Sequence, residues 1–304
     1  MSSLNIANST NTLNSANATN SVMNKKRRPV DLILHGTVLL FTAFVFLMTV
    51  YFAAYILFKG FGGLSLTLLT TAPNPITQTI GILPGIINTL YIILMSLFFA
   101  LPIGVGGAIY INEYAKNPKL VRVIEFTTET LSGIPSIIFG VFGYVFFCLF
   151  LDLKVSLIAG ALTLTLMVLP TIIRTTQEAL KAVPKSYREG ALGIGATKWY
   201  MIRTILLPSA SGGIITAIIL SIGRIVGESA ALLLVAGGSA MYMPRGNFFE
   251  QIMGSGATLS VELYRYAYSR GDNETGFAIA AILLMIVVIL NVSIKLISKK
   301  VGNS

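Results

Sequence analysis

Long apolar runs without a charged side chain constrain this chain more than any other feature of its sequence. A helix needs roughly 20 apolar residues to cross about 30 Å of hydrocarbon, because each residue advances it by about 1.5 Å. We find six runs of suitable length, and only the fifth contains Lys, Arg, Asp or Glu: 32–58, 86–112, 132–151, 155–173, 210–236 and 275–294. The sequence therefore predicts an all-α integral membrane protein with six transmembrane helices.

The composition agrees with a chain that lies mostly in a lipid bilayer. Hydrophobic residues make up 54% of the 304 residues and charged residues 11%, whereas soluble domains contain about 25% charged residues. Residues 1–24 differ, since this stretch is rich in Asn, Ser and Thr and has too little apolar surface to order itself. We therefore expect a disordered cytoplasmic tail (1–30), a first transmembrane helix with an external loop (31–79) and a larger membrane domain (80–298).

The distribution of Lys and Arg predicts the orientation in the membrane. Of the 22 basic residues, sixteen lie in four segments that six spans place on one face: 25–28, 113–131, 174–209 and 295–300. Segments rich in Lys and Arg stay on the cytoplasmic side. We therefore expect both termini to be cytoplasmic. Within 113–131, a cytoplasmic helix should begin near Pro118, because Pro suits a first helical turn.

Residues 184–208 form the most polar interior stretch of the chain. The sequence predicts one short helix from Pro184 that contains Glu189, a turn at Gly195, and a second helical run from Thr197 that ends at Pro208. We call this stretch the elbow. Its one acidic residue, Glu189, stands among several basic ones: Lys185, Arg188, Lys198 and Arg203. Such a segment has to face water or another protein.

The spacing within the elbow resembles the EAA loop of type I ABC importer permeases. Six residues fall at the positions of that motif: Glu189, Ala191, Gly195, Ile205, Leu207 and Pro208. Gly190 replaces an Ala of the motif, which should loosen the first short helix by about 1 kcal/mol. The resemblance implies that the elbow couples transport to a cytoplasmic ATPase, through Tyr187, Arg188, Glu189, Gly190, Ala191 and Gly195. An ordinary amphipathic cytoplasmic loop is the alternative.

Several kinds of site are not expected in this chain. The glycine-rich run 190–198 lacks the Gly-Lys-Ser/Thr sequence of a phosphate-binding loop, so ATP hydrolysis should belong to another subunit and the chain should not be an enzyme. One Cys, Cys148, and one His, His35, are too few for an internal disulfide or a structural metal site. We expect no cofactor and no nucleic-acid partner.

The fifth run contains a second group of polar residues. Small and polar residues recur on one face of a continuous helix: Gly213, Ala217, Ser221, Arg224, Glu228 and Ala231. Charged side chains at this depth are costly unless they face the bundle interior or a water-filled path. We therefore assign Ser221, Arg224 and Glu228 to a translocation path. A static Arg224–Glu228 ion pair between helices is the alternative interpretation.

Four further stretches are similar to phosphate-transport permeases of the PstA type: 103–116, 131–143, 224–237 and 258–267. That resemblance implies a prokaryotic plasma-membrane subunit for import of inorganic phosphate. It implies a second homologous permease subunit, two ATPase subunits at the cytoplasmic face and an extracytoplasmic phosphate-binding protein. A permease for another oxyanion, such as molybdate or sulfate, is the nearest alternative. A gradient-driven anion carrier and a membrane-embedded enzyme are weaker ones, because the chain shows no second copy of the elbow and the spans offer one carboxylate.

Overall fold

The computed structural model describes residues 29–74, 79–238 and 247–301, so the expected disordered tail falls almost wholly outside the described residues. The chain divides into two units, one that ends at Ala54 and one that begins at Tyr55. The boundary falls within a single long helix, α2 (Pro29–Gly63). Large apolar side chains such as Phe41 and Phe44 are exposed along the first unit's part of α2. A helix that is apolar on all sides suits lipid surroundings.

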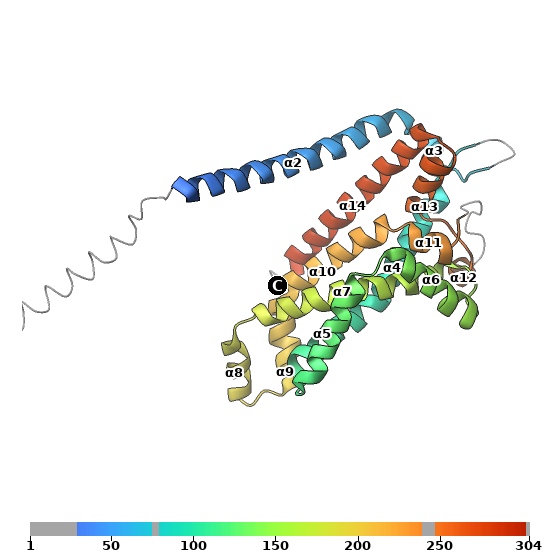
Figure 1. Ribbon diagram of the computed structural model, residues 1–304. Helices are drawn as coiled ribbons and strands as arrows, with labels where there is room; N and C mark the ends of the chain where they lie inside the picture. Colours follow the sequence, from blue (N-terminus) through green and yellow to red (C-terminus); the bar gives the residue numbers. More distant parts are fainter. Residues whose placement is uncertain (1–28, 75–78, 239–246, 302–304) are drawn as a thin grey trace, which may run out of the picture. The chain divides into compact units, whose positions relative to one another are not determined.

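The second unit is helical, as predicted (Figure 1). Within the described residues, the one β-type pairing is an isolated bridge between Asn74 and Thr79. The α-helices after α2 are α3 (Leu66–Thr70), α4 (Leu83–Ile109), α5 (Pro118–Ser132), α6 (Ser136–Gly143), α7 (Leu157–Ala182), α8 (Lys185–Gly193), α9 (Lys198–Met201), α10 (Leu207–Gly227), α11 (Ala230–Val235), α12 (Phe248–Met253), α13 (Leu259–Tyr264) and α14 (Asn273–Val301). Four π-helical turns continue α4, α6, α9 and α13: η1 (Tyr110–Tyr114), η2 (Tyr144–Phe150), η3 (Ile202–Leu206) and η4 (Arg265–Ser269).

Five helices in the described part of the chain are long and apolar enough to cross a membrane. A sixth span requires that α5 and the helix 136–150 count as one, although they meet at an angle of 102°. The bend lies at Gly133–Pro135, where Pro135 removes a backbone donor and restricts the residue before it. The prediction of a helix from Pro118 is confirmed, because the side chain of Asn117 accepts the backbone N–H of Lys119 and Pro118 opens α5.

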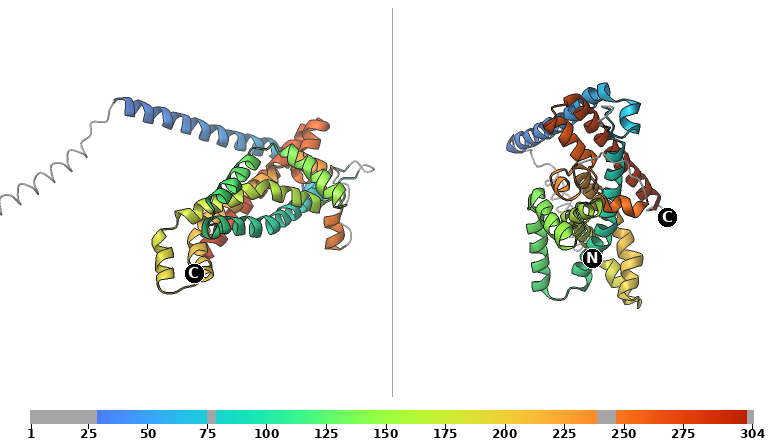
Figure 2. Two further views of the ribbon diagram at one scale, coloured as in Figure 1. Left: turned by 60° about the horizontal axis from the view of Figure 1, so that its bottom comes forward. Right: turned by 90° about the vertical axis from the view of Figure 1, so that its right-hand side faces the viewer.

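Helix α7 is the centre of the second unit, and it packs against α4, α10, α5 and α6 (Figures 1 and 2). Its buried side chains include Leu164, Met167 and Ile172, each fully covered. Gly213 of α10 allows close helix approach, because a Cβ built there would lie 2.2 Å from the Cβ of Ala179. The small-residue positions predicted on this helix therefore serve in part to bring α10 against α7.

A second, smaller cluster of buried apolar residues lies apart from this main core. It joins the end of α4 to the end of α7 and to the elbow, and its members are Ala108, Leu180, Val183, Ala191, Met201, Ile202, Leu206 and Ala210. Every large member is at least nine-tenths buried. The elbow is therefore packed onto the ends of two long helices and is not a free loop.

Two predicted boundaries are wrong. The second helical run of the elbow does not end at Pro208, because α9, η3 and α10 form one helix over Lys198–Gly227. Pro208 lies in the first turn of α10 directly after the π turn, where a missing N–H is tolerated. The fifth apolar run is not one helix either, since α10 ends at Gly227 and Glu228 has an extended backbone with φ −80° and ψ 120°.

Candidate functional site

The turn of the elbow is a complete helix C-terminal motif. Gly195 has φ +84°, a left-handed conformation that Gly adopts without strain. The N–H of Ala196 donates to the carbonyl of Ala191 at 3.0 Å, and the N–H of Gly195 donates to that of Leu192 at 3.0 Å. These two bonds are the pattern that closes a helix with Gly just beyond its end. The predicted turn at Gly195 is therefore confirmed, and it reverses the chain between α8 and α9.

The outer surface of the elbow combines apolar and charged side chains. Ala191 is buried and anchors α8, whereas the side chain of Tyr187 is half exposed. Ile194, at the tip, is 87% exposed, and Leu192, Trp199 and Tyr200 are exposed as well. Exposed apolar patches of this kind occur at protein–protein and membrane contacts.

Glu189 and Gly190 lie on the exposed side of α8. Among the described residues, Glu189 has no ion-pair partner. Within this part of the structure, neither of the neighbouring basic residues Lys185 and Arg188 forms an ion pair with Glu189. A Cβ added to Gly190 would meet no atom within 4 Å. Both positions are open to a partner.

Arg188 points inward from the elbow. Its Nε lies 3.1 Å from Oε1 of Glu113 in η1, and the two side chains are 19% and 7% exposed. Its other two nitrogens donate to backbone carbonyls at the end of α7, those of Val183 at 2.9 Å and Leu180 at 2.7 Å. Arg188 thereby adds side-chain donors at the end of α7, where the carbonyl of Leu180 also accepts the N–H of Val183 at 3.3 Å.

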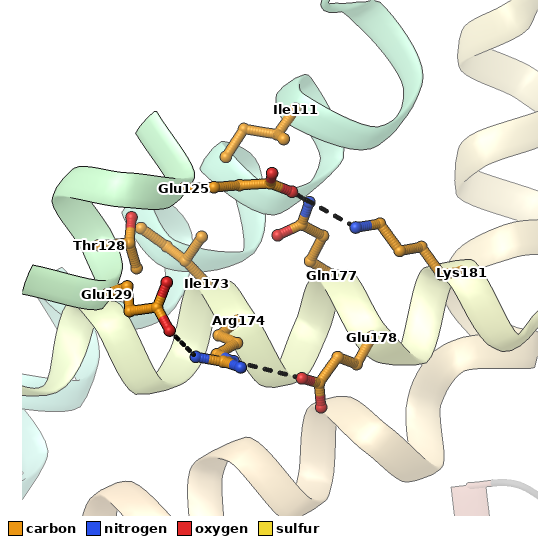
Figure 3. Close-up of a pocket in the computed structure, with 9 residues that line it drawn as sticks. All are labelled: Ile111, Glu125, Thr128, Glu129, Ile173, Arg174, Gln177, Glu178 and Lys181. Carbon is orange, nitrogen blue, oxygen red and sulfur yellow. Dashed lines mark hydrogen bonds and ion pairs between the residues drawn. The ribbon is translucent and has the colours of Figure 1, made fainter. Parts of the chain in front are cut away.

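A polar clasp joins α5 to the end of α7 around a cavity of about 240 Å³ (Figure 3). Nε2 of the buried Gln177 donates to Oε1 of Glu125 at 2.7 Å, and Nζ of Lys181 lies 3.4 Å from the same oxygen. The bond from Gln177, followed by the bond and charge of Lys181, lowers the pKa of Glu125 below its ordinary value. Arg174 bridges two exposed carboxylates, which stabilises little.

The predicted polar face of the fifth run is interrupted at Glu228. Oε1 of Glu228 accepts the backbone N–H of Ala231 at 2.9 Å, in the first turn of α11. The carbonyl of Glu228 accepts the hydroxyl of Ser260 at 2.6 Å. Glu228 is 9% exposed. Both the side chain and the carbonyl of Glu228 are therefore hydrogen-bonded where the helix is interrupted. Because of this interruption, one continuous helical face cannot run from Gly213 to Ala231.

Arg224 lies in the last turn of α10 and is partly buried. Across the described ranges 29–74, 79–238 and 247–301, no ion pair joins it to Glu228 or to another carboxylate. The static pair is therefore not the arrangement in this structure. Ser221 is fully buried one turn earlier, and its hydroxyl donates to the carbonyl of Ala217 at 2.8 Å.

The sequence interpretation missed three functional candidates. Glu113 holds the elbow, Ser260 holds the break at Glu228, and the buried Glu262 pairs with Arg265 at 2.9 Å. Glu113 and Arg188, and likewise Ser260 and Glu228, lie far apart in the sequence, so residue spacing does not reveal these contacts. A carboxylate in an otherwise apolar stretch was the available signal for Glu113 and Glu262, because such groups are seldom buried without a partner.

Comparison with known proteins decides the family. Residues 100–303 match the family described as binding-protein-dependent transport system inner membrane component. The chain belongs to this family. The match contains the whole elbow and Glu113, the ion-pair partner of Arg188. The predicted kinship with importer permeases is confirmed.

Individual relatives agree with that placement. The permease is 37% identical to the probable ABC transporter permease protein YqgI of Bacillus subtilis (strain 168), over 74% of this chain and 75% of the relative. It is 33% identical to the phosphate transport system permease protein PstA of Xylella fastidiosa (strain Temecula1), over 78% of this chain and 80% of the relative. The inward-facing structure of the MetNI methionine ABC transporter in its native crystal form covers 73% of this chain and 94% of its own, with a TM-score of 0.56 and 25% identity.

This permease is therefore a membrane-embedded subunit of a binding-protein-dependent ABC importer. The predicted fold class, an all-α membrane permease, is confirmed. ATP hydrolysis in such importers belongs to a separate subunit.

Proposed function

We propose that this permease forms half of the translocation path for inorganic phosphate in an ATP-driven importer. The relative named as a phosphate transport permease is 33% identical over 78% of the chain. The observation that carries the proposal is the partly buried Arg224, which has no carboxylate partner within the described residues. A guanidinium that is not neutralised by a carboxylate offers its positive charge and several directed N–H donors to an oxyanion.

The path runs past the end of α10. Phosphate loses hydration on entering a low-dielectric bundle, and the fixed charge of Arg224 offsets that cost. Glu228 contributes by holding the break open, because its side chain accepts an N–H at the start of α11 and its carbonyl accepts the hydroxyl of Ser260 in α13. Ser221 belongs to the packed interface one turn below Arg224 and supports its position.

The elbow is the contact for ATPase subunits. Its exposed surface combines apolar groups at Ile194 and Trp199 with the charge of Glu189, which has no ion-pair partner among the residues that the structure describes. The inner side of the elbow is packed onto α4 and α7. Two ATPase subunits would bind the elbows of this permease and of a second homologous permease. The elbow and both termini then face the cytoplasm, and an extracytoplasmic phosphate-binding protein delivers the anion from the other side.

The substrate is tested by competition in intact cells that express the whole system. Uptake of labelled phosphate is measured in the presence of excess arsenate, sulfate, molybdate or methionine. We expect arsenate to compete, because it matches phosphate in shape and charge, and the other three to leave uptake unchanged. Uptake of sulfate or molybdate in preference to phosphate would assign the permease to another oxyanion. Uptake that survives loss of ATP but follows an ion gradient would indicate a carrier.

A further inference from the structure

We propose that Glu113 is a positioning residue that transmits movement of the elbow to α4. Glu113 lies in η1, the π turn that directly continues α4 toward the elbow. The inference rests on the proposed function, in which an ATPase subunit binds the elbow. The inference explains how movement of the elbow reaches α4, a helix that does not directly precede or follow the elbow in the sequence.

The need for such a route follows from connectivity. The elbow continues directly from α7 and leads directly into α10, so both helices follow its movement through the backbone. Helix α4 has no such link, since Glu113 and Arg188 are 75 residues apart. Movement of the elbow therefore reaches α4 through non-covalent contacts and not through a direct backbone connection.

Both arms of the elbow contact Glu113, just beyond the end of α4. Arg188 of α8 forms the partly buried ion pair with Glu113 at 3.1 Å. Lys198 of α9, on the other side of the Gly195 turn, donates from Nζ to the backbone carbonyl of Glu113. The same Nζ lies 4.9 Å from the centre of the Tyr114 ring, a cation–π contact.

The contact on Glu113 is fixed from its own side as well. Nδ2 of Asn112 donates to Oε1 of Glu113 at 2.8 Å, so the acceptor of Arg188 is held in place. Below it, Ala108 of α4 packs with Ala191 of α8 and Met201 of α9 in the small apolar cluster. The Glu113–Arg188 pair is largely shielded from water, oriented by Asn112 and adjacent to a packed apolar contact. The end of α4 should therefore move together with the elbow, because packed contacts transmit displacement.

The position of α4 makes its movement relevant to transport. α4 packs along α7 and also contacts α10, the helix that ends with Arg224 and Gly227. Gly104 of α4 lies so close to α7 that an added Cβ would be 2.6 Å from Ile172. A displacement of the cytoplasmic end of α4 is therefore not absorbed within α4 but reaches the helices around the proposed path.

The test uses the complete transporter in proteoliposomes, with permeases, ATPase subunits and binding protein. Phosphate uptake and ATP hydrolysis are measured on the same sample, and their ratio is the readout. For Glu113→Gln, which keeps the size of the side chain and one acceptor oxygen, we expect ATP hydrolysis within twofold of the wild type and uptake per ATP at least tenfold lower. The matched control is Glu178→Gln, an exposed carboxylate on α7 outside the elbow contact, which should leave the ratio unchanged.

A second variant keeps the inference testable if Glu113→Gln fails to assemble. Lys198→Met removes the charge of an exposed residue and should lower uptake per ATP several-fold without loss of complex. The variant with Glu113→Cys and Arg188→Cys, in a Cys148→Ala background, should hydrolyse ATP without coupled uptake. A short bifunctional thiol reagent that links the two new cysteines should restore the coupling. A merely structural contact would not be restored in this way.

The outcomes separate the two proposals. If the wild-type complex shows no ATP-dependent phosphate uptake, the proposed function is wrong. If the wild type couples and Glu113→Gln or Lys198→Met keeps the wild-type ratio, the role of Glu113 is wrong while the proposed function stands. A tenfold loss of ratio with ATPase bound and active supports the role of Glu113.

Discussion

The side chain of Glu228 bonds to the backbone of Ala231, with 2.9 Å between Oε1 and the amide nitrogen. The carboxylate therefore satisfies a free N–H at the start of α11 and does not neutralise Arg224. Two residues four apart on a helix can pair, but the extended backbone at Glu228 ends the helix between Arg224 and the Glu228 side chain. The extended backbone at Glu228 thus ends α10, and the guanidinium of Arg224 remains in the last turn of that helix without Glu228 as its partner.

A charge swap separates this arrangement from a static ion pair. Arg224→Glu combined with Glu228→Arg should abolish uptake, because an Arg at position 228 cannot accept the N–H of Ala231. Glu228→Gln keeps an acceptor oxygen and should preserve complex yield. Uptake and the yield of assembled complex are measured for both. Full transport by the swapped protein would show that the two residues act only as a pair.

Replacing Arg224 alone tests its role toward the anion. Arg224→Gln should abolish phosphate uptake while the protein still inserts and assembles, and Arg224→Lys should keep part of the activity since its charge remains. Arg122→Gln, at an exposed position of α5, is the control and should transport normally. Initial uptake rates normalised to the amount of complex provide the comparison. Normal uptake by Arg224→Gln would remove this residue from the path.

Two glycines of the elbow should respond in opposite ways to the same change. Gly195→Ala places a Cβ on a residue with φ +84° and should cost about 1–2 kcal/mol, which distorts the turn. Gly190→Ala lies within α8 with open space around it and should stabilise that helix by about 1 kcal/mol. We expect coupled uptake to fall for the first variant and to persist for the second. Equal effects of both changes would mean that the turn geometry is unimportant.

The α5–α7 clasp should give a pH-dependent contribution to stability. Because the folded pKa of Glu125 is lowered, chiefly by Gln177, the contribution is complete above the ordinary carboxyl pKa and is lost as the pH falls through the lowered one. The difference in melting temperature between wild type and Gln177→Leu should therefore shrink in acid. In a Glu125→Gln background that shrinkage should disappear. A difference that grows in acid would contradict the assigned direction.

The long helices could be predicted because lipid selects uncharged apolar runs, a purely local property. The turn at Gly195 was predictable for the same reason, since the chemistry of glycine decides it locally. The break at Glu228 was not, because 221–231 is compatible with a helix and the break depends on Ser260, 32 residues away. The Glu113–Arg188 pair has no signal in the spacing of residues, because the fold brings together positions 75 residues apart.

The central claim is that the elbow is the surface on which an ATPase subunit acts, and cross-linking tests it most directly. A single cysteine at Ile194, the elbow tip at 87% exposure, is introduced in a Cys148→Ala background and treated with a short cross-linker in the complete transporter. We predict a covalent product with the ATPase subunit, whose yield changes between nucleotide-free and ATP-bound conditions. A cysteine at Tyr268, an exposed residue of η4 outside the elbow, should give none. Absence of the product at Ile194, or an equal product at Tyr268, would contradict the account.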